Sequence, residues 1–99
     1  MIQVPSPLRL RLDRDALVAN WRWLAAQSGT AACGAAIKAD GYGLGARDVM
    51  RHLAAAGCRD FFVATWAEAA ALMPLPAGVS LSVLHGVGAS DMIAARTLP

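Results

Sequence analysis

Residues 8–28 combine two different spacings of hydrophobic side chains. In residues 8–12 leucine alternates with arginine, a two-residue period that predicts a strand with one buried and one solvated face. Asp13 follows as a candidate helix cap. The apolar side chains after it recur at helical spacing: Leu17, Val18, Trp21, Leu24 and Ala25. Ser28 and Gly29 predict that this helix ends near residue 27.

Three later runs of largely apolar residues predict buried strands. They cover residues 31–37, 60–64 and 79–84. The segments between and after them predict helices at 46–56, at 66–73 and from Ser90 toward Arg96. Thr65 and Glu68 fit a capping box, in which a hydroxyl and a carboxylate each accept a hydrogen bond from a backbone amide at the helix start. Because strands alternate with helices, the predicted fold class is α/β with right-handed crossovers and a parallel sheet.

About three strand–helix units follow the leading strand in a chain of 99 residues. A closed eight-stranded (β/α) barrel takes roughly 250 residues, so the pattern predicts either a small open sandwich or an incomplete parallel barrel. A last helix that starts so close to Pro99 favours the incomplete barrel, with residues 1–99 as one partial domain. The charged face of residues 8–12 does not match the apolar later strands, and we expect this segment to pair outside the barrel.

Composition indicates a globular protein, with 57% hydrophobic and 16% charged residues. The net charge is +2, but the arginines are dispersed among acidic residues, which argues against a nucleic-acid partner. Cys33 and Cys58 lack metal-ligand spacing. We therefore expect two reduced core cysteines and no metal site.

The stretch of residues 69–90 carries no Asp, Glu, Lys or Arg and is long enough to cross a bilayer. Pro74, Pro76 and several glycines interrupt it, so it predicts a helix end, a turn and a buried strand, with no membrane partner. The N-terminus has no basic segment followed by an apolar one, as a secretory signal requires, and we expect a cytoplasmic location.

Lys38 is the only lysine among nine Lys and Arg residues. An amine can lose its proton and attack a carbonyl, whereas a guanidinium stays charged. Lys38 falls at the predicted carboxyl end of the strand at 31–37, where parallel α/β proteins collect functional groups. The glycine-rich loop 41–45 leads from it into a helix N-terminus, a natural place for an anion. Together these features suggest an aldehyde cofactor that carries a phosphate, although the loop matches no nucleotide-binding motif.

Residues 36–46, with the sequence AIKADGYGLGA, closely resemble the pyridoxal-phosphate attachment segment of the alanine racemases, which usually reads VVKADAYGHGA. Residues 12–20 and 62–69 are also similar to segments of that family. The resemblance covers nearly the whole chain and only the N-terminal part of the family. It implies a pyridoxal-phosphate-binding (β/α) barrel followed by a β-rich domain, with which the leading strand packs.

The resemblance also implies roles for individual residues. Lys38 would be the Schiff-base lysine and one of two proton-transfer bases. Tyr42 would contact the cofactor phosphate, and Leu84 would pack beside the cofactor, with a plain core leucine as the alternative. The second base would be a tyrosine of the partner subunit, so a homodimer is expected. Leu44 and Gly41 depart from the usual histidine and alanine of the family.

The function implied is the racemisation of L-alanine and D-alanine by an isomerase, which supplies D-alanine for peptidoglycan. Two alternatives stay open. One is a catalytically inactive fragment or cofactor-binding module. The other is a different pyridoxal-phosphate barrel enzyme, such as a decarboxylase or a D-amino-acid aldolase, against which the loop containing Tyr42 argues.

Overall fold

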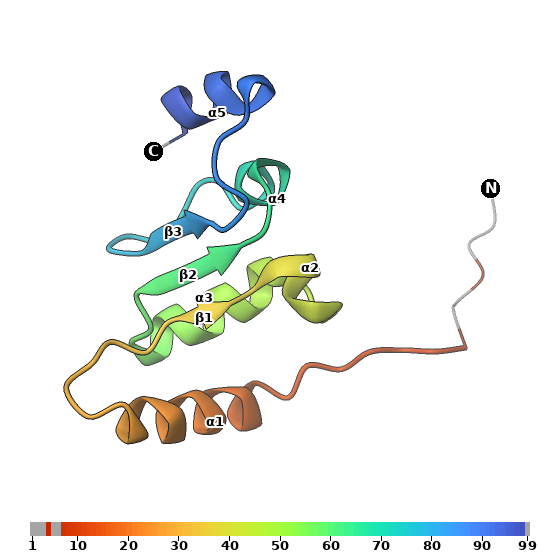
Figure 1. The fold of residues 1–99 in the computed structure, drawn as a ribbon. Coiled ribbons are helices and arrows are strands. Elements are labelled where there is room, and N and C mark those ends of the chain that lie inside the picture. Colours follow the sequence, from red (N-terminus) through yellow and green to blue (C-terminus); the bar gives the residue numbers. More distant parts are fainter. Residues whose placement is uncertain (1–3, 5–6, 99) are drawn as a thin grey trace.

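The computed structural model describes residues 4 and 7–98 and has a three-stranded parallel sheet at its centre (Figure 1). The strands lie in the order β1 (Ala35–Ala36), β2 (Asp60–Val63) and β3 (Ser80–Val83). The helices are α1 (Arg14–Gln27), α2 (Lys38–Tyr42), α3 (Ala46–Ala56), α4 (Trp66–Ala71) and α5 (Met92–Thr97), with a 3-10 turn at Ala89–Asp91. Both strand pairs are parallel, which confirms the predicted α/β class.

Local capping explains where the helices begin and end. The amide of Ala16 donates to Asp13 Oδ1 at 3.0 Å at the start of α1, and Gly57, with φ of 117°, ends α3. The capping box of Thr65 and Glu68 is present at the start of α4. Each boundary was predicted, because a cap is a contact between residues close in sequence.

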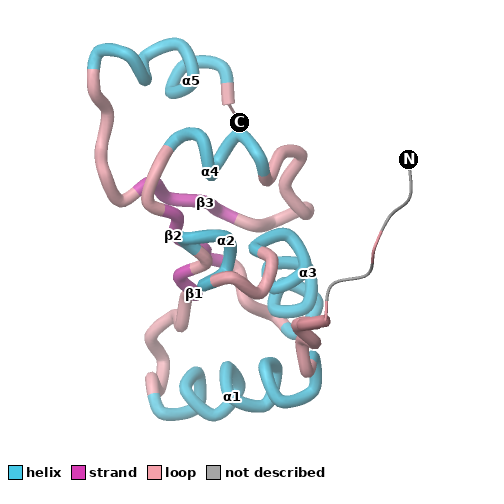
Figure 2. The backbone as a smooth tube through the Cα atoms, turned by 90° about the vertical axis from the view of Figure 1, so that its right-hand side faces the viewer, coloured by secondary structure: helices cyan, strands magenta, loops and turns pink. Residues whose placement is uncertain are grey.

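The core lies between the sheet and its helices. Phe61 and Val63 of β2 are fully buried in one cluster with Met50 and Leu53 of α3 and Leu72 after α4. Figures 1 and 2 show α3 beside the strands and α1 alongside α3. Because side chains alternate along a strand, the other face of the sheet carries different residues, and these are partly or fully exposed: Ala36, Phe62 and Ser82.

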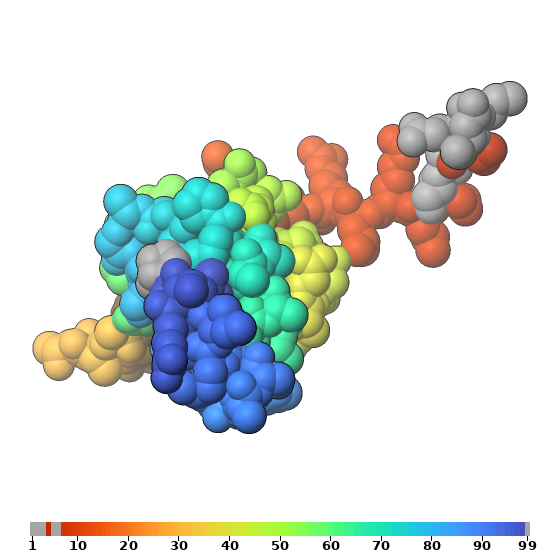
Figure 3. Space-filling view, turned by 90° about the horizontal axis from the view of Figure 1, so that it is seen from above, coloured from red at the N-terminus to blue at the C-terminus, as the bar shows by residue number. Residues whose placement is uncertain are grey.

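Two sequence predictions about the existence and length of strands are wrong. Residues 8–12 form no strand, because they lie outside the sheet: residues 8–11 extend away from the body of the molecule, and Leu12 packs against the core (Figures 1 and 3). That they pair outside the barrel stays a prediction. The strand expected at 31–37 shortens to Ala35–Ala36, the two residues that stand opposite Phe61 and Phe62.

The charge-free stretch of residues 69–90 forms the end of α4, a turn and β3, as predicted. The prediction that this strand is buried is wrong for the described chain, because the residues of β3 are exposed or only partly buried. None of the helices in the described part of the chain is both long and apolar enough to cross a membrane.

Candidate active site

Lys38 and Leu84 lie at the same edge of the sheet. The register places Ala36, Phe62 and Ser82 in one row, and Lys38 and Leu84 stand two residues beyond it. The ladder continues past the ends of the strands. The Ile37 amide donates to Phe62 O and the Leu84 amide to Val63 O, both at 2.8 Å. The structure therefore brings two of the predicted site residues to one carboxyl edge.

Side chains at this edge are accessible. Leu84 is 56% exposed in the described chain, and its packing beside the cofactor stays a prediction. Lys38 is half-buried, and its amine makes no hydrogen bond or ion pair with residues 4 and 7–98. The amine is thus available to a group that binds over the sheet edge.

The residues after Lys38 form one turn of left-handed helix, where the sequence predicted a loop. Residues 39–42 all have positive φ, at 52°, 54°, 65° and 57°. The Gly41 amide donates to Ile37 O at 2.9 Å, and the Gly43 amide donates to Ala39 O at 3.0 Å. A left-handed residue other than glycine costs roughly 1–2 kcal/mol. Such strain persists only where the surroundings impose it, and it gathers at functional sites.

Asp40 connects this turn to the start of α3 through hydrogen bonds. The Ala46 amide donates to Asp40 Oδ1 at 2.9 Å, and the Gly45 amide donates to the Asp40 backbone oxygen at 2.8 Å. The carboxylate thus lies at the positive end of the α3 dipole. The anion at this helix N-terminus belongs to the chain itself, where the sequence suggested a phosphate.

Gly41 allows the turn to approach α3 closely. It is buried, and a Cβ in its place would lie 3.2 Å from both the N and the Cα atoms of Ala46, tighter than ordinary contact. This contact gives a physical reason for glycine where the family usually has alanine.

Glu68 connects the same turn to α4 through hydrogen bonds. The Ala39 amide donates to Glu68 Oε2 at 2.6 Å, while the amides of Ala64 and Thr65 donate to Oε1 at 2.8 and 3.0 Å. Partial burial by itself raises the pKa of the Glu68 carboxyl, but the hydrogen bonds from Thr65, Ala64 and Ala39 outweigh it and hold the pKa below its usual value. The capping box was predicted, but the bond to Ala39 was missed because 29 residues separate the two partners.

Tyr42 lies on the left-handed turn and is 63% exposed. With Leu44 it belongs to the lining of a cavity of about 340 Å³, to which α1 and the segment before β1 also contribute. Its contact with a phosphate stays a prediction.

The two cysteines are free thiols. Cys58 is fully buried and its Sγ donates to Cys33 O at 3.6 Å, whereas Cys33 is only partly buried. Burial raises the pKa of the Cys58 thiol, which makes this thiol a poor nucleophile. The prediction of a core residue is confirmed for Cys58.

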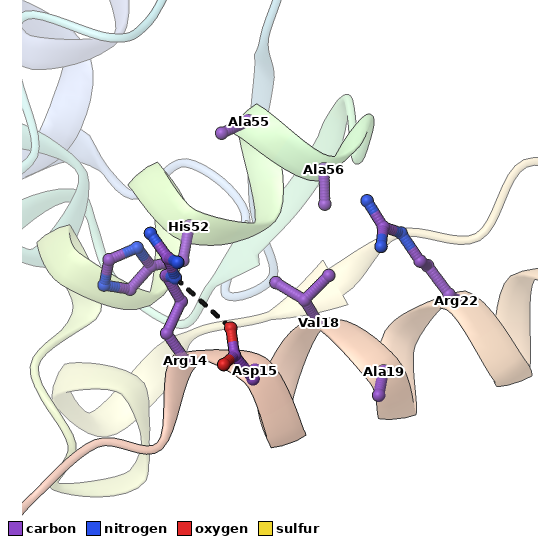
Figure 4. A pocket seen from close by; sticks show the side chains of 8 residues that line it. All are labelled: Arg14, Asp15, Val18, Ala19, Arg22, His52, Ala55 and Ala56. Carbon is purple, nitrogen blue, oxygen red and sulfur yellow. Dashed lines mark ion pairs between the residues drawn. The ribbon is translucent and has the colours of Figure 1, made fainter.

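A groove of about 470 Å³ between α1 and α3 is a second hollow of the molecule (Figure 4). His52 faces α1 across it, and Arg14 pairs with Asp15 at 3.6 Å in an exposed ion pair of little energetic weight. None of its lining residues comes from the strand ends that carry Lys38 and Leu84. The groove is therefore a seam between two packed helices, separate from the candidate site.

Residues 12–98 match the model of a protein family described as "Alanine racemase, N-terminal domain". The chain belongs to this family. It is 48% identical over 82 residues to the biosynthetic alanine racemase of Agrobacterium fabrum, a match that covers 83% of this chain and 21% of that protein. It is 47% identical over 78 residues to the alanine racemase of Methylobacterium nodulans, covering 79% and 21%.

The fold has a close counterpart among solved structures. The crystal structure of alanine racemase from Bartonella henselae, which has covalently bound pyridoxal phosphate, matches with a TM-score of 0.76 and 41% identity. The match covers 82% of this chain and 23% of that one. This likeness confirms the predicted α/β fold of the alanine racemase N-terminal type. The chain spans about a fifth of the length of the curated relatives it matches.

Proposed function

We propose that this chain forms the cofactor-attachment part of an alanine racemase, an isomerase that interconverts L-alanine and D-alanine. The observation that carries the proposal is the position of the single lysine. Its amine stands at the carboxyl edge of a parallel sheet, directly before a strained left-handed turn that two carboxylates hold. Relatives that are 47–48% identical are alanine racemases, which supports the same conclusion.

The residues at this edge fit pyridoxal phosphate at its aldehyde end. The amine of Lys38 has no hydrogen bond or ion pair within the described part of the chain and can form a covalent link, and exposed Leu84 offers an apolar surface at the same edge. The phosphate would need another partner than the N-terminus of α3, because Asp40 already occupies it. The hydroxyl of exposed Tyr42 is the candidate that the family resemblance implies.

When bound, pyridoxal phosphate draws electrons away from the α-carbon of the amino acid and makes its proton easier to remove. Lys38 would hold the cofactor and, once substrate has displaced it, move a proton at the α-carbon on one face. A second base must act on the opposite face. By the family resemblance it would be a tyrosine of the partner subunit in a cytoplasmic homodimer, and the product D-alanine would serve peptidoglycan synthesis.

A second candidate function concerns the chain by itself. Small-molecule sites bury most of the surface of their ligand, but Ala36, Ser82 and Leu84, on the rows that lead to Lys38, are exposed. An open sheet edge encloses no ligand, so we expect the isolated 99-residue chain neither to racemise alanine nor to hold the cofactor tightly. On its own it would be a catalytically inactive fragment.

Borohydride trapping tests the main proposal on the full-length protein that carries this chain. After incubation with pyridoxal phosphate, reduction and peptide mass mapping should find the label on Lys38. Lys38→Arg keeps the charge but cannot form the link, and it should lose the label together with about 10²–10⁴-fold of the racemase rate. Chiral chromatography of the alanine formed separates racemisation from decarboxylation or aldol cleavage. An active protein without label on Lys38 would refute the assignment.

A further inference from the structure

Glu68 bridges the carboxyl ends of two neighbouring strands. Its carboxylate accepts from Ala39, the residue after Lys38, and from Ala64, the residue after β2. Lys38 and Ala64 each stand two residues beyond the paired row of Ala36 and Phe62, so both bonds lie at the edge of the sheet that carries the lysine. Glu68 therefore reaches the lysine segment from the N-terminus of α4.

The left-handed turn depends on contacts from outside. Within the turn, the amides of Gly41 and Gly43 are satisfied by Ile37 O and Ala39 O. The amide of Ala39, the first left-handed residue, has its acceptor in Glu68. Lys38 and Ala39 share a peptide bond, so the orientation of Ala39 also affects the direction in which the Lys38 side chain points.

The two carboxylate oxygens have separate tasks. Oε1 accepts from Ala64 and Thr65 and so completes the start of α4, whereas Ala39 is the only donor to Oε2 among the described residues. The bond to the lysine turn can therefore be removed without removing the bonds that cap α4.

We propose that Glu68 is a positioning residue for Lys38, which holds the first residue of the left-handed turn and thereby directs the lysine amine toward its cofactor. This inference rests on the function proposed above, in which Lys38 carries the cofactor. Nothing in it requires Glu68 to touch the cofactor or the substrate.

Glu68→Gln is the critical variant. A glutamine is also suited to a capping box, and its one oxygen can still accept from Ala64 and Thr65. Its NH2 group then faces the amide of Ala39, so that two donors oppose each other. If the side-chain amide of the glutamine turned the other way, its oxygen would keep the bond from Ala39 but lose the bonds from Ala64 and Thr65. Glu68→Gln should therefore lose the bond to the lysine turn and retain the start of α4.

Thr65→Ala is the matched control. It removes the hydroxyl that accepts from the Glu68 amide at 3.2 Å and weakens α4, but it leaves the carboxylate and Ala39 in place. If the role of Glu68 is purely structural, cofactor attachment in both variants should fall in proportion to their loss of melting temperature. A positioning role predicts that cofactor attachment separates them.

The measurements use the full-length protein with pyridoxal phosphate. We expect Glu68→Gln to slow the covalent capture of the cofactor at Lys38 by about tenfold, as for loss of a hydrogen bond to a charged group, and to shift the pH dependence of the absorbance of the bound cofactor. Thr65→Ala should lower the melting temperature and leave both readouts near those of wild type. Equal capture by Glu68→Gln and wild type, or equal losses in both variants, overturns the inference.

Two further results are also decisive. If wild type itself is not labelled at Lys38, the proposed function fails and this inference fails with it, whereas normal labelling of wild type and Glu68→Gln refutes only the positioning role. If Glu68→Gln does not fold, amide hydrogen exchange of Ala39 in wild type replaces it. Slow exchange supports the bond to Glu68, and exchange at the rate of an open loop overturns the inference.

Discussion

Asp40 allows a direct test of the left-handed turn, because it combines a positive φ with a capping carboxylate. Its φ is 54°, and its Oδ1 accepts from the Ala46 amide at 2.9 Å. Three substitutions separate the two features. Asp40→Asn keeps an acceptor and removes the charge. Asp40→Gly removes the acceptor but suits the backbone, and Asp40→Ala removes the acceptor and suits positive φ less well than aspartate does.

The expected changes follow from the contacts of Asp40. Removing a negative charge from a helix N-terminus lowers the free energy of unfolding by about 0.3–1 kcal/mol, and asparagine tolerates positive φ. Loss of the capping acceptor lowers it by about 1 kcal/mol. The glycine variant loses a further amount of about 0.5–1 kcal/mol through the entropy of the unfolded chain. The alanine variant instead loses a further amount of about 1–2 kcal/mol through its left-handed backbone. Stability should therefore fall in the order wild type, Asn, Gly, Ala.

Urea unfolding of the full-length protein, followed by circular dichroism, measures these differences. Asp40→Gly is the reference for Asp40→Ala, because both lack the carboxylate and the left-handed backbone strains only the alanine variant. An alanine variant as stable as the glycine variant would refute the left-handed turn. An asparagine variant as unstable as the alanine variant would refute the capping bond.

Two further predictions concern packing and pH. A Cβ at Gly34 would lie 2.7 Å from Phe62 Cε2 and 2.9 Å from Asp60 O, so Gly34→Ala should lower the free energy of unfolding by about 1–3 kcal/mol. The control is Gly29→Ala, which has open space around it and should lower the free energy of unfolding by only about 1 kcal/mol through its positive φ. Equal losses in the two variants would contradict the clash at Gly34. The pKa of folded Glu68 lies below its usual value of 4.5, so this carboxylate stabilises the fold above about pH 4.5 and the stabilisation is lost as pH falls through the lower folded pKa. Melting temperatures of wild type should accordingly fall more steeply in acid than those of Glu68→Gln, and parallel curves would contradict the shift.

Features that depend on near neighbours in sequence could be predicted well. Asp13 and Thr65 mark helix starts and Gly57 marks a helix end, because each cap is a contact within a few residues. The parallel sheet also followed from the alternation of strands and helices. The strand expected at residues 8–12 did not form, since a two-residue period shows that a segment suits a strand but does not provide the neighbour it must pair with.

The candidate site divides in the same way. The single lysine, its place at the end of a strand and its family resemblance are properties of the sequence alone, and they were enough to select Lys38. The left-handed conformation of residues 39–42 could not be predicted from the sequence, because alanine and tyrosine have no intrinsic preference for it. Only the folded chain brings the Glu68 carboxylate to Ala39 across 29 positions, places Asp40 at the start of α3 and sets Leu84 at the same edge as Lys38. These are contacts between elements that packing alone brings together, and for that reason the tertiary structure decided how the lysine is held.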